Sequence, residues 1–194
     1  MQRRITTEAA VRRHARRLFL KQGYADTSVR QIAAAARVSA GTVVSVGTKD
    51  QLFVTCMEEA ATEAALGVLT AEQDPRAALR AFVVAAPGLT AEGTELSRDY
   101  LRALLAIGSD PGNEERLGRV LALITSRWAE LLGLPDEHSR VVLCAGNFYM
   151  SLIGCVYAVA AGQLRADDAV ELLHGMIDGA TAENAVNAPS GCDQ

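Results

Sequence analysis

The sequence predicts an all-α fold of about nine helices, in which an N-terminal three-helix helix-turn-helix domain precedes a C-terminal helical bundle. Hydrophobic residues make up 49% of the 194 residues but aromatic residues only 5%, a balance that favours packed helices over a sheet. Apolar residues also recur at helical spacing along most of the chain. The five prolines stand beside Gly, Asp or Ser between these stretches, where they mark loops or helix starts.

The first two predicted helices differ in length. The span 7–22 places apolar residues on one face at helical spacing, and Gly23 follows it as a C-terminal stop. A shorter helix over 28–36 opens with a capping box, in which Ser28 and Gln31 each bond to the other's backbone. The apolar stripe of this second helix can pack against the first.

A tight turn separates the second helix from a third, very short one. Ser39 caps the helix over 39–46, and Thr48 with Gln51 forms a second capping box that opens a long connecting helix, 48–69. Two short helices across a tight turn form a helix-turn-helix motif. Five further helices with usable apolar faces are predicted over 75–86, 92–108, 112–132, 137–163 and 167–185.

Charge divides the chain into two parts. Residues 1–50 contain ten Lys and Arg against three Asp and Glu, a net charge of +7, whereas the rest contains nine against twenty, a net charge of −11. A basic head on an acidic body is typical of a chain that places one end on a polyanion and keeps the other end off it. The alternative at this point is a basic helix that is simply solvated.

The stretch 18–43, LFLKQGYADTSVRQIAAAARVSAGTV, resembles the N-terminal signature of the tetracycline-repressor (TetR) family. The resemblance covers about 45 residues, and over the rest of the chain only helix number and layout agree. It implies a homodimeric DNA-binding repressor with a ligand pocket in its C-terminal domain. The matching elements are Leu18-Phe19, Gly23-Tyr24, Thr27-Ser28-Val29, Ile32-Ala33, Val38-Ser39 and Gly41-Thr42.

We therefore expect a DNA-binding domain over 1–47, a ligand-binding and dimerisation domain over 48–185, and a flexible tail over 186–194. In a helix-turn-helix the third helix enters the major groove, while hydroxyls and helix N-termini bind phosphates. For the hydroxyls, simple helix capping is the alternative. The candidate DNA contacts are Arg3, Arg4, Thr27, Ser28, Arg30, Ser39, Ala40, Gly41, Thr42, Val44, Ser45, Thr48 and Lys49.

Three departures from the family pattern concern DNA recognition. Arg37 stands in the turn where the family usually has Gly, and Val44 and Val46 replace aromatic phosphate-binding residues. The spacing before the family's Lys is also one residue shorter, so the turn into the connecting helix is rebuilt around Gly47. Helix 39–46 then lacks every side chain that binds purines in bidentate fashion, which predicts affinity dominated by phosphate contacts and specificity drawn partly from DNA shape. The alternative is a helical ligand-binding or interaction protein with only nonspecific DNA affinity.

The uncharged stretch 141–164 is long enough to cross a bilayer, but its polar and small residues favour a buried interface helix and no membrane contact. Small residues recur in it every four positions, as in closely packed helices, and the last helix continues the apolar pattern. An intramolecular core is the alternative. A two-fold dimer predicts an approximately palindromic DNA site. The predicted dimer interface comprises Gly154, Ala158, Gly162, Leu173, Met176 and Ile177.

A ligand pocket is predicted among the helices between 75 and 163, although its candidate residues are also what a plain core would contain. Because basic groups are scarce there, the unknown small-molecule effector is expected to be apolar and neutral or cationic. The candidate lining residues are Phe82, Tyr100, Leu104, Trp128, Phe148, Tyr149 and Met150.

Enzymatic, metal and cofactor functions find no support in the sequence. His14, His138 and His174 are scattered, and the four cysteines have no metal-ligand spacing. The N-terminus lacks the apolar stretch of a signal peptide, which predicts a cytoplasmic protein. Activation and repression both stay open, because both use the same DNA-binding head.

Overall fold

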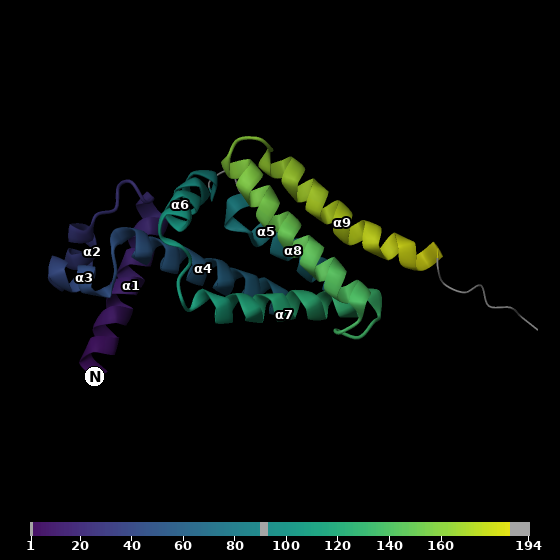
Figure 1. Ribbon diagram of the computed structural model, residues 1–194, viewed down its shortest axis with the longest axis horizontal. Helices are drawn as coiled ribbons and strands as arrows, with labels where there is room; N and C mark the ends of the chain where they lie inside the picture. Colours follow the sequence, from purple (N-terminus) through teal and green to yellow (C-terminus); the bar gives the residue numbers. More distant parts are fainter. Residues whose placement is uncertain (1, 90–92, 187–194) are drawn as a thin grey trace, which may run out of the picture. The chain divides into compact units, whose positions relative to one another are not determined.

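The computed structural model describes residues 2–89 and 93–186, and side chains within 6–86, 88–89 and 95–180. Its described part contains nine α-helices, one short 3-10 helix and no strand, which confirms the predicted all-helical fold (Figure 1). The helices are α1 Gln2–Gln22, α2 Val29–Ala36, α3 Ala40–Val46, α4 Lys49–Ala71, α5 Pro75–Ala85, η1 Pro87–Leu89, α6 Gly93–Ile107, α7 Asn113–Leu132, α8 Ser139–Ala160 and α9 Ala166–Val186.

The predicted helices all exist, and their observed ends lie within a few residues of the predicted ones. The largest difference is at the N-terminus, where α1 begins at Gln2 rather than at residue 7. The 3-10 helix η1 was not predicted. Residues 187–194, most of the predicted tail, lie outside the described residues.

Two compact units make up the chain. The first, here called the head unit, comprises Met1–Thr62 and Glu95–Arg116. Its core forms because α1, α2, α3, the first part of α4 and α6 each bury an apolar face in one cluster. This cluster includes Val11, Phe19, Ile32, Val43 and Phe53.

The second unit, here called the body unit, comprises Glu63–Thr94 and Leu117–Gln194. Its core contains Trp128 from α7 and Phe148 from α8, whose rings meet edge to face at 5.7 Å. Helix α9 packs against both α5 and α8. Among the described residues α8 alone is long and apolar enough to cross a membrane by length and composition, and one of its faces belongs to this core.

This division follows packing and differs from the functional boundary predicted after residue 47. Helix α4 runs through residues of both units, and α6 joins the head unit. The predicted functional domains concern DNA and ligand binding, so they stay a prediction.

A buried carboxylate connects α4 to the segment between α6 and α7 within the head unit. Glu58 accepts hydrogen bonds from the Ser109 hydroxyl at 2.5 Å, the Asp110 amide at 3.2 Å and the Arg116 guanidinium at 3.3 Å. Burial raises the pKa of Glu58, although these three donors oppose the rise. The bonds satisfy a carboxylate that would otherwise be costly to bury, and they hold the segment against α4.

Candidate nucleic-acid interface

The start of α2 has the predicted capping box. The Ser28 amide donates to Gln31 Oε1 at 2.7 Å, and the Gln31 amide donates to Ser28 Oγ at 3.2 Å. Ser28 and Arg30 are both exposed. A hydroxyl, a guanidinium and a helix N-terminus therefore lie together at the surface, where they can bind a phosphate.

Thr27, although adjacent to Ser28, faces inward. Its side chain is 1% exposed, and its hydroxyl donates to the carbonyl of Gly23 at 2.7 Å. The residue therefore braces the connection between α1 and α2 and does not belong to the exposed surface beside Ser28.

The outer face of helix α3 consists mainly of small side chains. The Ser39 hydroxyl caps it by accepting from the Thr42 amide at 3.0 Å, while the side chain of Val43 is fully buried in the core of the head unit. With Val43 directed inward, the small residues at the start of the helix and the two residues that follow Val43 point outward. The exposed residues are Ser39, Ala40, Gly41, Val44 and Ser45, with Thr42 partly buried.

Arg37 adopts the left-handed backbone conformation that the turn requires. Its φ of 57° and ψ of 44° make it the one non-glycine residue with positive φ among the described residues. In this conformation its amide caps the end of α2 by bonding to the carbonyls of Ala33 and Ala34. The chain thus keeps the turn of a helix-turn-helix while using a residue that is strained in it.

The start of α4 is held by its own capping box and by a tyrosine. The Thr48 amide donates to Gln51 Oε1 at 2.9 Å, and the Gln51 amide donates to Thr48 Oγ1 at 3.2 Å, as predicted. The Lys49 ammonium lies 3.9 Å from the centroid of the Tyr24 ring, a cation–π contact. This contact therefore holds the Lys49 side chain at the first turn of α4.

Tyr24 also binds the neighbouring residue of α4. Its hydroxyl donates to the carboxylate of Asp50, and burial together with this bond raises the pKa of Tyr24 to about 12. Its ring lies 4.9 Å from that of Phe53. The Gly23-Tyr24 pair does not by itself predict this positioning role, because Asp50 is 26 residues away in the sequence.

Arg3 and Arg4 belong to α1, but their side chains lie outside the described residues. No group of three or more His, Cys, Asp or Glu residues in the described part of the chain is arranged to hold a metal ion.

The seven candidate pocket residues are divided between the two units. Tyr100 and Leu104 pack in the core of the head unit. Phe82, Trp128 and Phe148 lie in the core of the body unit, with Tyr149 packed beside them. Met150 instead faces outward, with 66% of its surface exposed.

The six candidate dimer residues also separate into groups. Leu173 and Ile177 are fully buried in the core of the body unit, so the single chain already covers them. Gly154 and Gly162 are exposed, and Ala158 and Met176 are partly buried.

Comparison with known proteins locates the similarity at the N-terminal end. Residues 11–55 match the model of the bacterial regulatory proteins of the tetR family. No curated protein matches the chain.

Several solved structures share the fold over nearly the whole chain. A TetR-like transcriptional regulator from Rhodococcus sp. RHA1 has a TM-score of 0.53 at 21% identity, covering 91% of this chain and 96% of its own. A regulator of the TetR/AcrR family from Thermobifida fusca YX-ER1 has a TM-score of 0.50 at 18% identity, covering 92% and 98%. At these identities the likeness concerns the fold.

We expect Arg37→Gly to raise the free energy of unfolding by about 0.5–1 kcal/mol. Relief of left-handed strain, about 1–2 kcal/mol, exceeds the extra backbone entropy of an unfolded glycine, about 0.5–1 kcal/mol. Urea unfolding measures the difference. Arg37→Ala removes the same charge but keeps a Cβ, so it should give no gain; equal gains in both variants would attribute the effect to charge and contradict the strain argument.

Proposed function

The chain belongs to the tetR family of bacterial regulatory proteins, and we propose that it is a ligand-responsive repressor, which binds a palindromic operator as a dimer and leaves it when a small molecule binds. As a regulator of this family it binds DNA and is not an enzyme. The observation that carries the proposal is the outer face of α3, exposed between the capped starts of α2 and α4.

The composition of that face indicates which contacts would supply affinity for DNA and which would supply selectivity. Ala40 and Val44 offer methyl groups that fit thymine, whereas no Arg, Lys, Asn or Gln lies on α3. Charge lies beside the helix instead, on Arg30 of α2 and Lys49 of α4. Phosphate contacts should therefore supply most of the affinity, and apolar contacts and DNA shape most of the selectivity.

Selection of bound sequences from a random duplex library, followed by titration across salt concentrations, tests the proposal. Wild-type protein should recover one palindromic motif. Lys49→Gln should weaken binding to all sequences alike and reduce the slope of log K against log salt by about 0.9, the value for one lost phosphate contact. Val44→Ala should lower the preference for the motif and leave the slope unchanged.

Arg119→Gln is the matched control, because Arg119 is an exposed basic residue on α7 outside the proposed surface. Its slope should equal that of the wild type. Salt-sensitive binding without a recovered motif would favour the second candidate, a helical ligand-binding protein with only nonspecific DNA affinity, which the absence of purine-binding side chains on α3 supports.

An apolar seam on α8 supports the proposed dimer. Leu143 and Met150, seven residues apart, are 63% and 66% exposed, and Gly154 and Tyr157 follow Met150 after four and then three residues. This is the spacing of a helix that packs against another along its length. Exposed Leu172 and Gly175 on α9 offer a second apolar surface. We therefore propose an interface that retains Gly154 and Ala158 but omits Leu173 and Ile177.

Met150→Asp should weaken the dimer by at least about 30-fold, because a charge at the centre of an apolar interface costs about 2 kcal/mol or more. Sedimentation equilibrium measures the dissociation constant. Leu105→Asp is the control: Leu105 on α6 is 78% exposed and lies outside the seam, so this variant should dimerise normally. Equal dimerisation of all three proteins would contradict the proposed interface.

The core of the body unit supports an effector site near Trp128. The side chain is 1% exposed, and its indole Nε1–H is buried without a hydrogen-bond partner in the described structure. A buried donor without an acceptor is costly, so an effector that supplies an acceptor atom would gain binding energy there. The apolar surroundings fit a largely apolar molecule, neutral or cationic.

Trp128 is the chain's single tryptophan, so its fluorescence gives a direct readout of that site. A panel of apolar amines and neutral aromatic compounds should contain molecules that change this fluorescence and also release DNA. Trp128→Phe should weaken release by such a compound by about 2- to 10-fold, the effect of one neutral hydrogen bond. If a releasing compound acts equally on both proteins, the indole is not its partner.

A further inference from the structure

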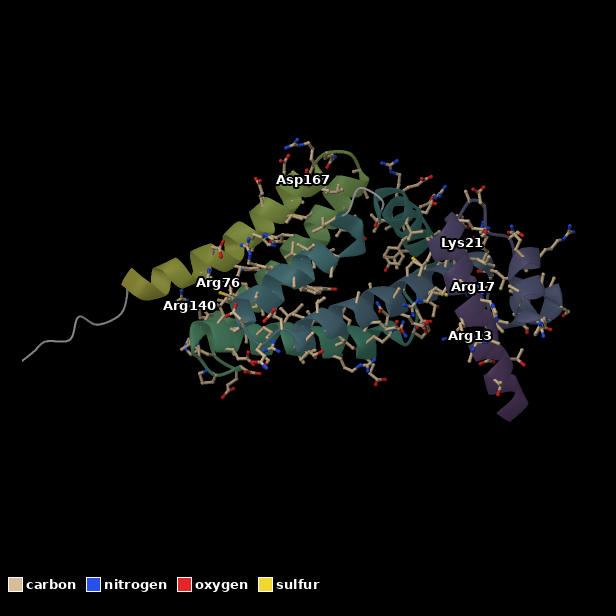
Figure 2. The ribbon with its side chains drawn as sticks, turned by 180° about the vertical axis from the view of Figure 1, so that it is seen from behind. Arg13, Arg17, Lys21, Arg76, Arg140 and Asp167 are labelled. Atoms are coloured by element: carbon tan, nitrogen blue, oxygen red, sulfur yellow. The ribbon has the colours of Figure 1, made fainter. Side chains whose placement is uncertain are left out.

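The outer face of α1 carries a row of basic side chains, here called the α1 stripe. It consists of Arg13, Arg17 and Lys21, which follow one another at intervals of four residues and so share one face of the helix. Figure 2 shows the three along α1. All are exposed, and none has an ion-pair partner within the described part of the chain. Among the residues of α1 the only acidic one is Glu8.

The stripe lies on the side of α1 that faces away from the helix-turn-helix. Val11, Ala15 and Phe19 are fully buried and pack in the same cluster as Ile32 of α2 and Val43 of α3. Each stripe residue follows one of these buried residues by two positions, which is a rotation of about 200° around the helix axis. A duplex held by the outer face of α3 therefore meets a different surface of the head unit.

The positive charge of the stripe is locally uncompensated. His14, which lies within it, has its pKa lowered by burial and by the charges of Arg17, Arg13 and Arg37. The charges of Arg13 and Arg17 thus add together at this point of the helix. A row of positive charges of this kind attracts a polyanion.

The spacing of the stripe fits a nucleic-acid backbone. Successive stripe residues are separated by about 6 Å along the helix axis. Phosphates recur about every 3.4 Å along the axis of one DNA strand, so alternate phosphates match successive side chains.

We propose that the α1 stripe binds the phosphate backbone of a second DNA segment while α3 holds the first. The inference rests on the DNA binding of the proposed function and adds a second contact surface to it. DNA is the occupant that these observations favour, since the chain already binds DNA and the stripe offers three cations at phosphate spacing. A regulator with two such surfaces can pass between DNA segments without complete dissociation.

A bridging assay with the full-length protein tests the inference. The protein is bound to an immobilised random-sequence duplex of about 30 base pairs, and retention of a second, fluorescent duplex is measured at about 0.1 M salt. Wild-type protein should retain the second duplex. Arg13→Gln/Arg17→Gln should reduce the affinity for the second duplex by at least about tenfold, because each lost phosphate contact costs about eightfold at this salt concentration. Its affinity for the immobilised duplex should stay within about twofold of wild type.

Arg119→Gln/Arg165→Gln is the matched control. It removes the same charge from two exposed arginines on the rest of the chain, and it should bridge as wild type does. Comparison of the two double variants shows whether bridging depends on where the two positive charges lie or only on the net charge of the protein.

Four results would overturn the inference. Bridging that is absent in the wild type, or equal in the stripe variant and the wild type, would mean that the stripe holds no second duplex. An equal loss of affinity for both duplexes would mean that the stripe contacts the DNA held by α3. Failure of the wild-type protein to bind the immobilised duplex, together with failure to recover any bound sequence from the random library, would overturn the proposed function itself, an outcome distinct from the other three.

Discussion

The packing of Phe19, Tyr24 and Phe53 controls the geometry of the head unit. Phe19 of α1 and Phe53 of α4 meet edge to face at 4.9 Å, and Tyr24 covers the same ring of Phe53. Because these rings come from α1, the turn after it and α4, their packing sets how the helix-turn-helix meets the connecting helix. The Tyr24 hydroxyl and ring then position Asp50 and Lys49 at the start of α4. A core contact thereby determines where the positive charge of Lys49 lies.

Helix α8 has one face buried in the core and an opposite face with exposed apolar side chains. One face of α8 places Phe148 and Leu152 in the core of the body unit, while the opposite face leaves Leu143 and Met150 exposed. Exposed apolar side chains at coiled-coil spacing are unfavourable in water, and this cost is what a second copy of the chain would remove. The same helix can thus complete a core and offer an interface.

The basic side chains of the head unit lie on the helices around α3 and not on α3 itself. Helix α3 carries no ionisable side chain, whereas Arg30 and Lys49 lie on the helices beside it and Arg13 and Arg17 lie on the outer side of α1. Charge in these places strengthens attraction to DNA without distinguishing one base from another. The proposed recognition helix therefore offers methyl groups and no side chain that binds purines in bidentate fashion.

Local chemistry by itself determined most of the helices and their caps. The capping boxes of Ser28 with Gln31 and of Thr48 with Gln51 each involve residues three apart, so the sequence alone was sufficient to predict them. Only the tertiary structure decided which of two similar side chains faces outward. Thr27 turns inward beside exposed Ser28, and Ile177 is covered while Met150 is exposed, although all are compatible with their helices. The reason is physical: capping and periodicity act within a few residues, whereas burial depends on contacts between segments far apart in the chain.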